Sequence, residues 1–117
     1  MNTSVIDFHY HVGSMGRAGL PAKIDLYIEV MDAAGVDRAC INGAIHGDAK
    51  RGNDLVASFV EQAPDRFIPV AFISPHYPDE VIAELERCFD ELGSKFLKIY
   101  PDFLGRPQDD PVYFPAF

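Results

Sequence analysis

The sequence lacks tryptophan and is poor in basic residues for its length of 117. Ten Lys and Arg side chains stand against 18 Asp and Glu, so the net charge is −8 at pH 7. This balance argues against nucleic acid or an anionic membrane as a partner, because non-specific binding to either needs clustered cations. No apolar run approaches the length of a membrane span, and no basic segment followed by an apolar one begins the sequence.

Cysteine is also scarce. Cys40 lies in the strand-like segment RACIN, and Cys88 lies in the helix-like segment ERCFD. Free cysteine is among the most buried residue types, so we expect two buried thiols rather than a disulfide. Free thiols are typical of a reducing compartment, and we therefore expect a cytoplasmic protein.

Strand-like and helix-like patterns alternate along the chain. Apolar runs predict strands at residues 4–9, 38–42, 66–73 and 95–100. Helical spacing predicts helices at residues 23–34 and 53–63, and a third helix from Asp79 as its N-cap, with a stripe of Val81, Ile82, Leu85, Cys88, Phe89 and Leu92. Gly35, Pro64 and Gly93 are placed to end these helices. The order predicts a parallel sheet covered by helices, either a flavodoxin-like open sheet or part of a (βα)8 barrel.

The segment VIDFHYHVG (residues 5–13) carries polar residues at every second position. Side chains alternate between the two faces of a strand, so Asp7, His9 and His11 are predicted to share one face and the intervening apolar residues the other. No glycine-rich phosphate-binding pattern follows this strand. The polar residues accumulate towards its C-terminal end, where (βα)8 barrels place their active sites, and this favours the barrel.

A lysine on the last predicted strand supports the same interpretation. Alternation in KFLKIYP puts Phe96, Lys98 and Tyr100 on one face. An ammonium on a central strand needs an anion or water, because burying it unpaired is costly. The mouth of a barrel that holds a metal or an anionic substrate offers such a place. Asn42 also lies near the C-terminal end of its strand.

The D-x-H-x-H pattern resembles the first-strand signature of the amidohydrolase superfamily. The segments MDAAGVDRACIN, NDLVASFVEQAPDRFIPVAFISP, LGSKFLKIYP and DDPVYFPAF follow in order. Together they are similar to the amidohydrolase-related branch that includes aminocarboxymuconate-semialdehyde decarboxylase. The resemblance covers essentially all of residues 1–117, which we interpret as the N-terminal portion of one domain. It implies an α/β fold, namely a (βα)4 half of a TIM-type (β/α)8 barrel.

The resemblance also implies roles for four residues. His9 and His11 would be ligands of one divalent metal, with zinc expected first and manganese as the alternative. Asp7 would orient a ligand or cap the strand rather than bind the metal. Lys98 is the expected catalytic residue, as a cation that lines the site. From spacing alone, an H-x-H pair at a strand end is more often structural than metal-binding.

As a whole, the resemblance implies a metal-dependent hydrolase that acts on C–N or C–O bonds of a small carboxylated substrate. Two alternatives stay open: a non-oxidative decarboxylase or hydratase of the same branch, and a non-catalytic half-barrel that assembles with a second copy or a partner chain. No cofactor other than the metal is implied. His46 and His76 lie in loops, where we expect them to be solvated.

Half of the family pattern is missing from this sequence. TIM barrels use eight strands and typically ~250 residues, whereas four strands are predicted here. The family's other signature residues are histidines after strands 5 and 6 and an aspartate after strand 8. Catalytic zinc normally has three protein ligands, and His9 and His11 supply two. We therefore expect either a missing C-terminal half or a homo-oligomer.

We predict that the isolated 117-residue chain shows no appreciable hydrolase or decarboxylase activity with any added metal. Its metal site is incomplete, and strands 1 and 4 each leave one edge unpaired, which favours dimers of half-barrels or aggregation. Size-exclusion chromatography with light scattering, combined with a turnover assay, tests both statements. A monomer that binds zinc tightly and turns over substrate would contradict them.

Overall fold

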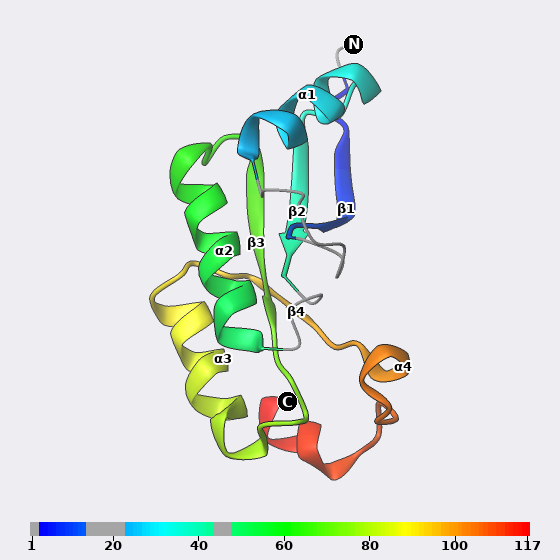
Figure 1. The fold of residues 1–117 in the computed structure, drawn as a ribbon, viewed down its shortest axis with the longest axis vertical. Helices are drawn as coiled ribbons and strands as arrows, with labels where there is room; N and C mark the ends of the chain where they lie inside the picture. Colours follow the sequence, from blue (N-terminus) through cyan, green and yellow to red (C-terminus); the bar gives the residue numbers. More distant parts are fainter. Residues whose placement is uncertain (1–2, 14–22, 44–47) are drawn as a thin grey trace.

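The fold is a four-stranded parallel sheet with helices between successive strands. The computed structural model describes residues 3–13, 23–43 and 48–117. In chain order the elements are β1 (Ile6–His11), α1 (Ile24–Ala34), β2 (Arg38–Asn42), α2 (Ala49–Gln62), β3 (Phe67–Phe72), the 3-10 helix η2 (Pro78–Glu80), α3 (Val81–Asp90), β4 (Phe96–Lys98), α4 (Pro101–Leu104) and the 3-10 helix η3 (Pro111–Ala116). The strands pair in the order β1-β2-β3-β4 (Figure 1). This is the predicted (βα)4 arrangement.

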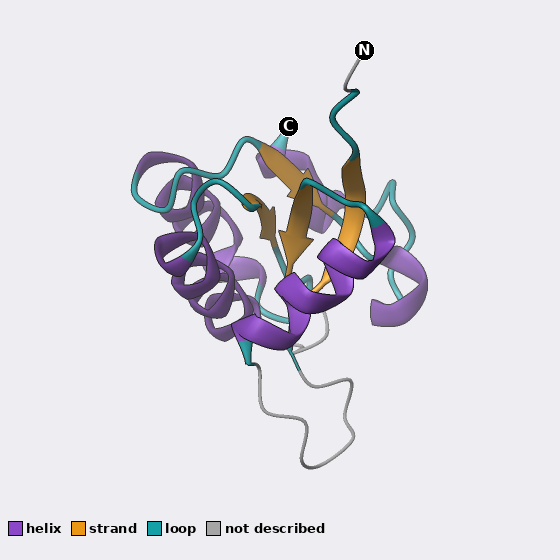
Figure 2. Ribbon diagram, turned by 90° about the horizontal axis from the view of Figure 1, so that it is seen from above, coloured by secondary structure: helices purple, strands orange, loops and turns teal. Residues whose placement is uncertain are grey.

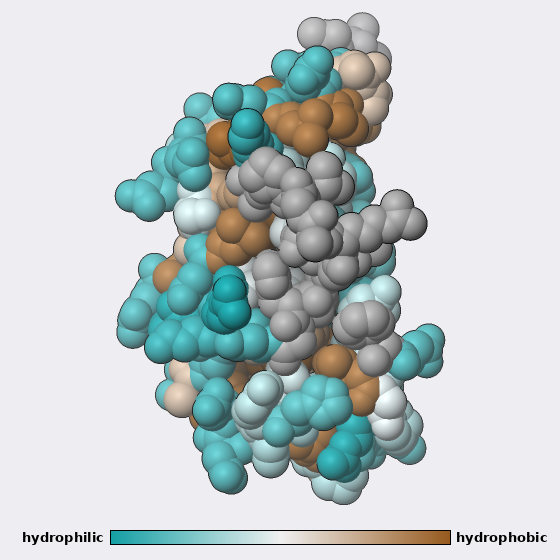
Figure 3. All heavy atoms as spheres, in the orientation of Figure 1, coloured by the Kyte–Doolittle hydropathy of each residue, from teal (hydrophilic) through white to brown (hydrophobic). Residues whose placement is uncertain are grey.

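Helices α1, α2 and α3 flank the curved sheet (Figure 2). The main core packs β1–β3 against α1 and α2, and its buried residues are Val12, Met31, Ala39, Ile41, Val56, Phe59 and Phe67. A smaller core of Ile73, Val81 and Tyr113 packs with Leu97 and Ile99. We call the sheet surface turned away from these helices the open face. Hydrophilic side chains line the outer side of α2 and α3 (Figure 3), and no helix within the described ranges is long and apolar enough to cross a membrane.

The open face keeps apolar side chains accessible. The rings of Phe8 on β1 and Phe96 on β4 meet edge to face, with centroids 5.1 Å apart. They remain 64% and 41% exposed, respectively. Two aromatic rings this exposed on a sheet surface are typical of a contact surface. In a complete barrel this surface would face the interior.

The ends of the first two helices follow from their capping residues. Gly35 ends α1 as predicted, with a left-handed φ of 69° that favours glycine. Helix α2 begins at Ala49, four residues earlier than predicted. The reason is Asp48, whose side chain accepts a hydrogen bond from the backbone N–H of Arg51 and so caps the helix.

Two predictions about the third helix are wrong. Asp79 is not its N-cap, because Asp79 lies inside η2 and α3 begins two residues later without a side-chain cap. The buried stripe also differs: Ile82 and Phe89 are 36% and 39% exposed, whereas Glu84 is buried. Periodicity could not predict a buried carboxylate, because its burial depends on hydrogen bonds from particular side chains, Asn53 on α2 and Arg87 on α3.

The first turn of α2 packs directly on the end of β2. A Cβ atom on either Gly43 or Gly52 would overlap the backbone of the other glycine. Neither position therefore accepts a larger side chain without moving the helix. This contact sets the N-terminus of α2 at the C-terminal end of β2, which is the end where barrel enzymes have their sites.

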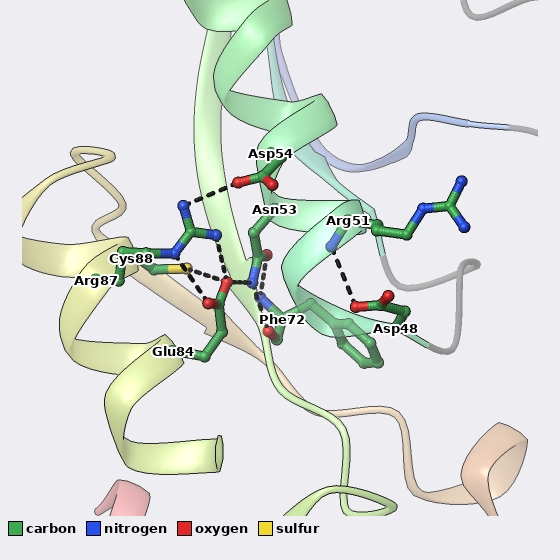
Figure 4. Close-up of polar contacts among 8 residues, drawn as sticks. All are labelled: Asp48, Arg51, Asn53, Asp54, Phe72, Glu84, Arg87 and Cys88. Carbon is green, nitrogen blue, oxygen red and sulfur yellow. Dashed lines mark hydrogen bonds and ion pairs between the residues drawn. The ribbon is translucent and has the colours of Figure 1, made fainter.

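Asn53 joins α2 to both β3 and α3 (Figure 4). Its amide nitrogen donates to the carbonyl oxygen of Phe72 at 2.9 Å and to Glu84 Oε1 at 2.8 Å. Its amide oxygen accepts from the N–H of Phe72 at 2.9 Å. One buried side chain thus satisfies both main-chain groups of the last β3 residue, in the manner of a neighbouring strand.

The buried carboxylate of Glu84 is held by charge as well. Arg87 donates to both of its oxygens, at 2.8 and 2.9 Å, and also pairs with Asp54 at 2.8 Å. Burial alone would raise the pKa of Glu84, but the hydrogen bonds from Arg87 and Asn53 lower it below its ordinary value. Burial and this carboxylate raise the pKa of the Cys88 thiol to about 12. Cys88 and Cys40 are both buried and free, as predicted.

We predict that Asn53→Ala lowers the free energy of unfolding by about 2–4 kcal/mol, because it leaves both main-chain groups of Phe72 buried without partners. Urea denaturation at fixed protein concentration measures the change. Gln62→Ala is the matched control on the same helix: its amide makes one exposed hydrogen bond to Ser58, and its effect should stay within about 0.5 kcal/mol. Equal effects of the two substitutions would show that Asn53 does not join the elements.

Candidate functional site

Strand β1 contains an irregularity just before its C-terminal end. The register pairs Asp7 with Ala39 and Tyr10 with Ile41, so β1 has one residue more than β2 in this stretch. Ala39 and Ile41 both belong to the main core under the helices. Asp7 and Tyr10 therefore lie, by register, on the helix side of the sheet.

The prediction that Asp7 shares a face with both histidines is wrong for this reason. Its carboxylate instead accepts a hydrogen bond from the backbone N–H of His9 at 2.9 Å. Phe8, predicted to lie opposite the histidines, meets Phe96 across the open face. The extra residue redirects these side chains, and strict alternation along the sequence could not reveal it.

His9 and His11 converge at the C-terminal end of β1. Their Nε2 atoms are 2.9 Å apart, and their ring centroids are 4.8 Å apart. A zinc-bound imidazole nitrogen lies about 2.0–2.1 Å from its ion, so two donors at this separation can share one ion. His9 is exposed and His11 is half-buried. The pair fits two ligand positions of a divalent metal by distance and by donor type.

His11 lies among residues from the other strands of the open face. Its ring stacks on Tyr100, with 6.1 Å between centroids and 24° between planes, and Lys98 Nζ lies 4.7 Å from the centre of the Tyr100 ring. Burial lowers the pKa of His11, and the charges of His9 and Lys98 lower it further, whereas the polar side chain of Asn42 raises it. A lowered pKa favours the neutral imidazole, which is the form that binds metals.

The pair stands without a third metal-binding side chain in the described part of the chain. No group of three or more His, Cys, Asp or Glu residues there could hold a metal ion. His76 is exposed, in agreement with the prediction. His46 lies outside the described residues.

Sequence reasoning gave no role to Asn42 or Tyr100. Asn42 is 2% exposed and lies beside His11 in the register of β1 and β2. Tyr100 follows β4 and reaches the same ring. The available signal was positional: both are polar residues at or just after the C-terminal end of a strand, the end at which His11 lies.

Comparisons with known proteins identify the family and the fold of this chain. A family model described as amidohydrolase matches residues 6–117. The 2-amino-3-carboxymuconate-6-semialdehyde decarboxylase of Dictyostelium discoideum is 37% identical over 65 residues, which are 56% of this chain and 18% of that protein.

Two solved structures share the fold at 20% identity. A 5-carboxyvanillate decarboxylase from Novosphingobium aromaticivorans, complexed with manganese and 4-hydroxy-3-methoxy-5-nitrobenzoic acid, matches 97% of this chain with a TM-score of 0.79. A 4-oxalomesaconate hydratase from Rhodopseudomonas palustris also matches 97%, with a TM-score of 0.70. The matched parts are 46% and 48% of those chains. The predicted fold, a (βα)4 half of a TIM-type barrel, is confirmed, and the chain spans about half the length of these structures.

Proposed function

This chain belongs to the amidohydrolase family, and we propose that it provides the first two metal ligands of a non-oxidative decarboxylase acting on a small carboxylic acid. The hydrolase expected first from the sequence has less support than this alternative. The curated relative that matches 56% of the chain is a decarboxylase. The two solved structures of the same fold are a decarboxylase and a hydratase.

The observation that carries the proposal is the convergence of His9 Nε2 and His11 Nε2 at 2.9 Å. Imidazole suits both zinc and manganese, and the manganese in the solved decarboxylase supports manganese as a candidate beside zinc. When bound, such an ion supplies Lewis-acid polarisation of a substrate oxygen. The two histidines hold the ion, and the main chain of His9 is in turn held by the Asp7 carboxylate.

Lys98 is the proposed binding group for the negative charge of the substrate. Its ammonium lies over the Tyr100 ring and close enough to His11 to lower the pKa of that imidazole. Phe96 lies two residues earlier on the same strand, and its ring is partly exposed on the open face. A cation next to an accessible aromatic surface suits an aromatic or unsaturated carboxylic acid.

The proposed activity requires the other half of a barrel. Three protein ligands are usual for a catalytic zinc, and the described residues offer the pair alone. The missing ligand and a general base would come from a complementary half-barrel, in the same polypeptide or in an associated chain. The two buried free thiols support a cytoplasmic location as part of the proposal.

We predict that His9→Ala and His11→Ala each abolish detectable binding of Mn²⁺ or Zn²⁺, since either change leaves a single imidazole. Equilibrium dialysis with elemental analysis of the protein measures bound metal, and circular dichroism checks that the fold is kept. His76→Ala removes an exposed histidine away from β1 and should bind metal as the unchanged protein does. Metal binding that survives both changes in β1 would disprove the proposed site.

We predict that Lys98→Met, in a form of the protein with a complete barrel, raises KM for a carboxylic acid substrate by about tenfold or more, the loss expected for one charge contact. Release of CO₂ from aromatic and unsaturated acids measures turnover. Lys95→Met is the matched control, because Lys95 is exposed and precedes β4. Unchanged kinetics for Lys98→Met would exclude a binding role, and hydrolysis without CO₂ release would exclude the decarboxylase.

A further inference from the structure

The second ring nitrogen of His11 has a defined environment. His11 presents Nε2 to His9, and its Nδ1 atom is buried. Nδ1 has no hydrogen-bond partner among the described residues. Asn42 on β2 is the register partner of His11 and is itself buried, so it is the polar side chain directly beside the ring. A metal-bound imidazole almost always donates its other N–H to an acceptor, which fixes the orientation and tautomer of the ring.

Asn42 is itself held firmly in place. It is the register partner of His11, and its carbonyl oxygen accepts from the N–H of Val12 at 3.0 Å. Its side-chain nitrogen Nδ2 donates to the carbonyl oxygen of Tyr10 at 3.4 Å. Because Nδ2 is directed at Tyr10, Oδ1 is the side-chain atom that can accept a proton from an imidazole N–H.

We infer that Asn42 is a positioning residue for His11: its Oδ1 accepts the Nδ1–H of the imidazole and keeps Nε2 unprotonated towards His9. The contact between the two Nε2 atoms then has one possible polarity, in which His9 donates and His11 accepts. In the metal-free chain the two rings therefore carry their protons on different nitrogens, His9 on Nε2 and His11 on Nδ1. With respect to metal binding, the inference rests on the proposed function.

In this arrangement the two rings differ in how they become metal ligands. His11 already has its Nε2 lone pair available, because Asn42 holds the proton on the opposite side of the ring. His9 is exposed, so it can exchange its Nε2 proton with water and become a ligand in turn. Loss of the Asn42 acceptor would leave His11 free to carry its proton on Nε2, the nitrogen that the ion needs.

Long-range ¹H–¹⁵N correlation spectra of the metal-free 117-residue chain at pH 8 test the inference directly, because they show which nitrogen of each neutral ring is protonated. The four histidines are assigned by single substitution to Gln. The expected result is a protonated Nδ1 for His11 and a protonated Nε2 for His9. A protonated Nε2 on His11 would overturn the inference, whether or not the chain binds metal.

Variants separate positioning from packing. Asn42→Leu should shift His11 towards the Nε2–H tautomer, and Asn42→Asp, which keeps an acceptor, should retain Nδ1–H. Cys40→Ala is the matched control, since Cys40 is buried two positions earlier on β2 and should leave both tautomers unchanged. If Asn42→Leu fails to fold, the unchanged chain and Asn42→Asp still decide the matter. An unchanged His11 tautomer in a folded Asn42→Leu variant would overturn the inference.

A Mn²⁺ titration connects the tautomer to the metal. This paramagnetic ion broadens the ring signals of the histidines that bind it. Asn42→Leu should raise the Mn²⁺ concentration needed to broaden the His9 and His11 signals about 10- to 100-fold. Absence of broadening in the unchanged chain would contradict the proposed function and leave the tautomer result standing. Equal titrations for the unchanged chain and Asn42→Leu would show that Asn42 does not position a ligand.

Discussion

The convergence of His9 and His11 depends on one extra residue in β1. Between the pairs Asp7–Ala39 and Tyr10–Ile41, the first strand has one residue more than the second. Such a bulge bends a strand and redirects its side chains, and bulges are common beside active sites. Here it lets Tyr10 remain in the helix-side core while both imidazoles of the H-x-H pair turn to the open face. The strand thus contributes an apolar side chain to the core and two imidazoles to the open face.

A second constraint holds the scaffold behind the site. Asn53 completes the hydrogen bonding of Phe72 at the end of β3 and passes the contact on to Glu84 of α3. Glu84 is stable in this buried position because Arg87 and Asn53 satisfy its oxygens. With the close approach of Gly43 and Gly52, these contacts fix α2 and α3 against the strands, so the strand ends that carry the site have a rigid support.

Much of the fold followed from local pattern. Apolar periodicity located the four strands and the helices α1, α2 and α3, and Gly35 ended α1 because only a residue that tolerates positive φ closes a helix in this way. Errors arose where one particular side-chain partner, whether near or distant in sequence, decides the outcome. Helix α2 was predicted too short because a carboxylate, Asp48, caps it ahead of its apolar stripe. The burial of Glu84 was not predicted, because it depends on hydrogen bonds from Asn53, 31 residues away, and from Arg87.

In the candidate site, too, some features were predictable from the sequence and others were not. Sequence by itself determined the chemistry, namely two imidazoles two residues apart near a strand end and a lysine on the fourth strand, because residue type and strand position are local properties. Only the tertiary structure decided which side chains meet there. It removed Asp7 from the histidine face through the bulge, brought Asn42 beside His11, and placed Tyr100 against the His11 ring. These contacts depend on the register between strands, and register is set by the packing of the whole sheet against its helices.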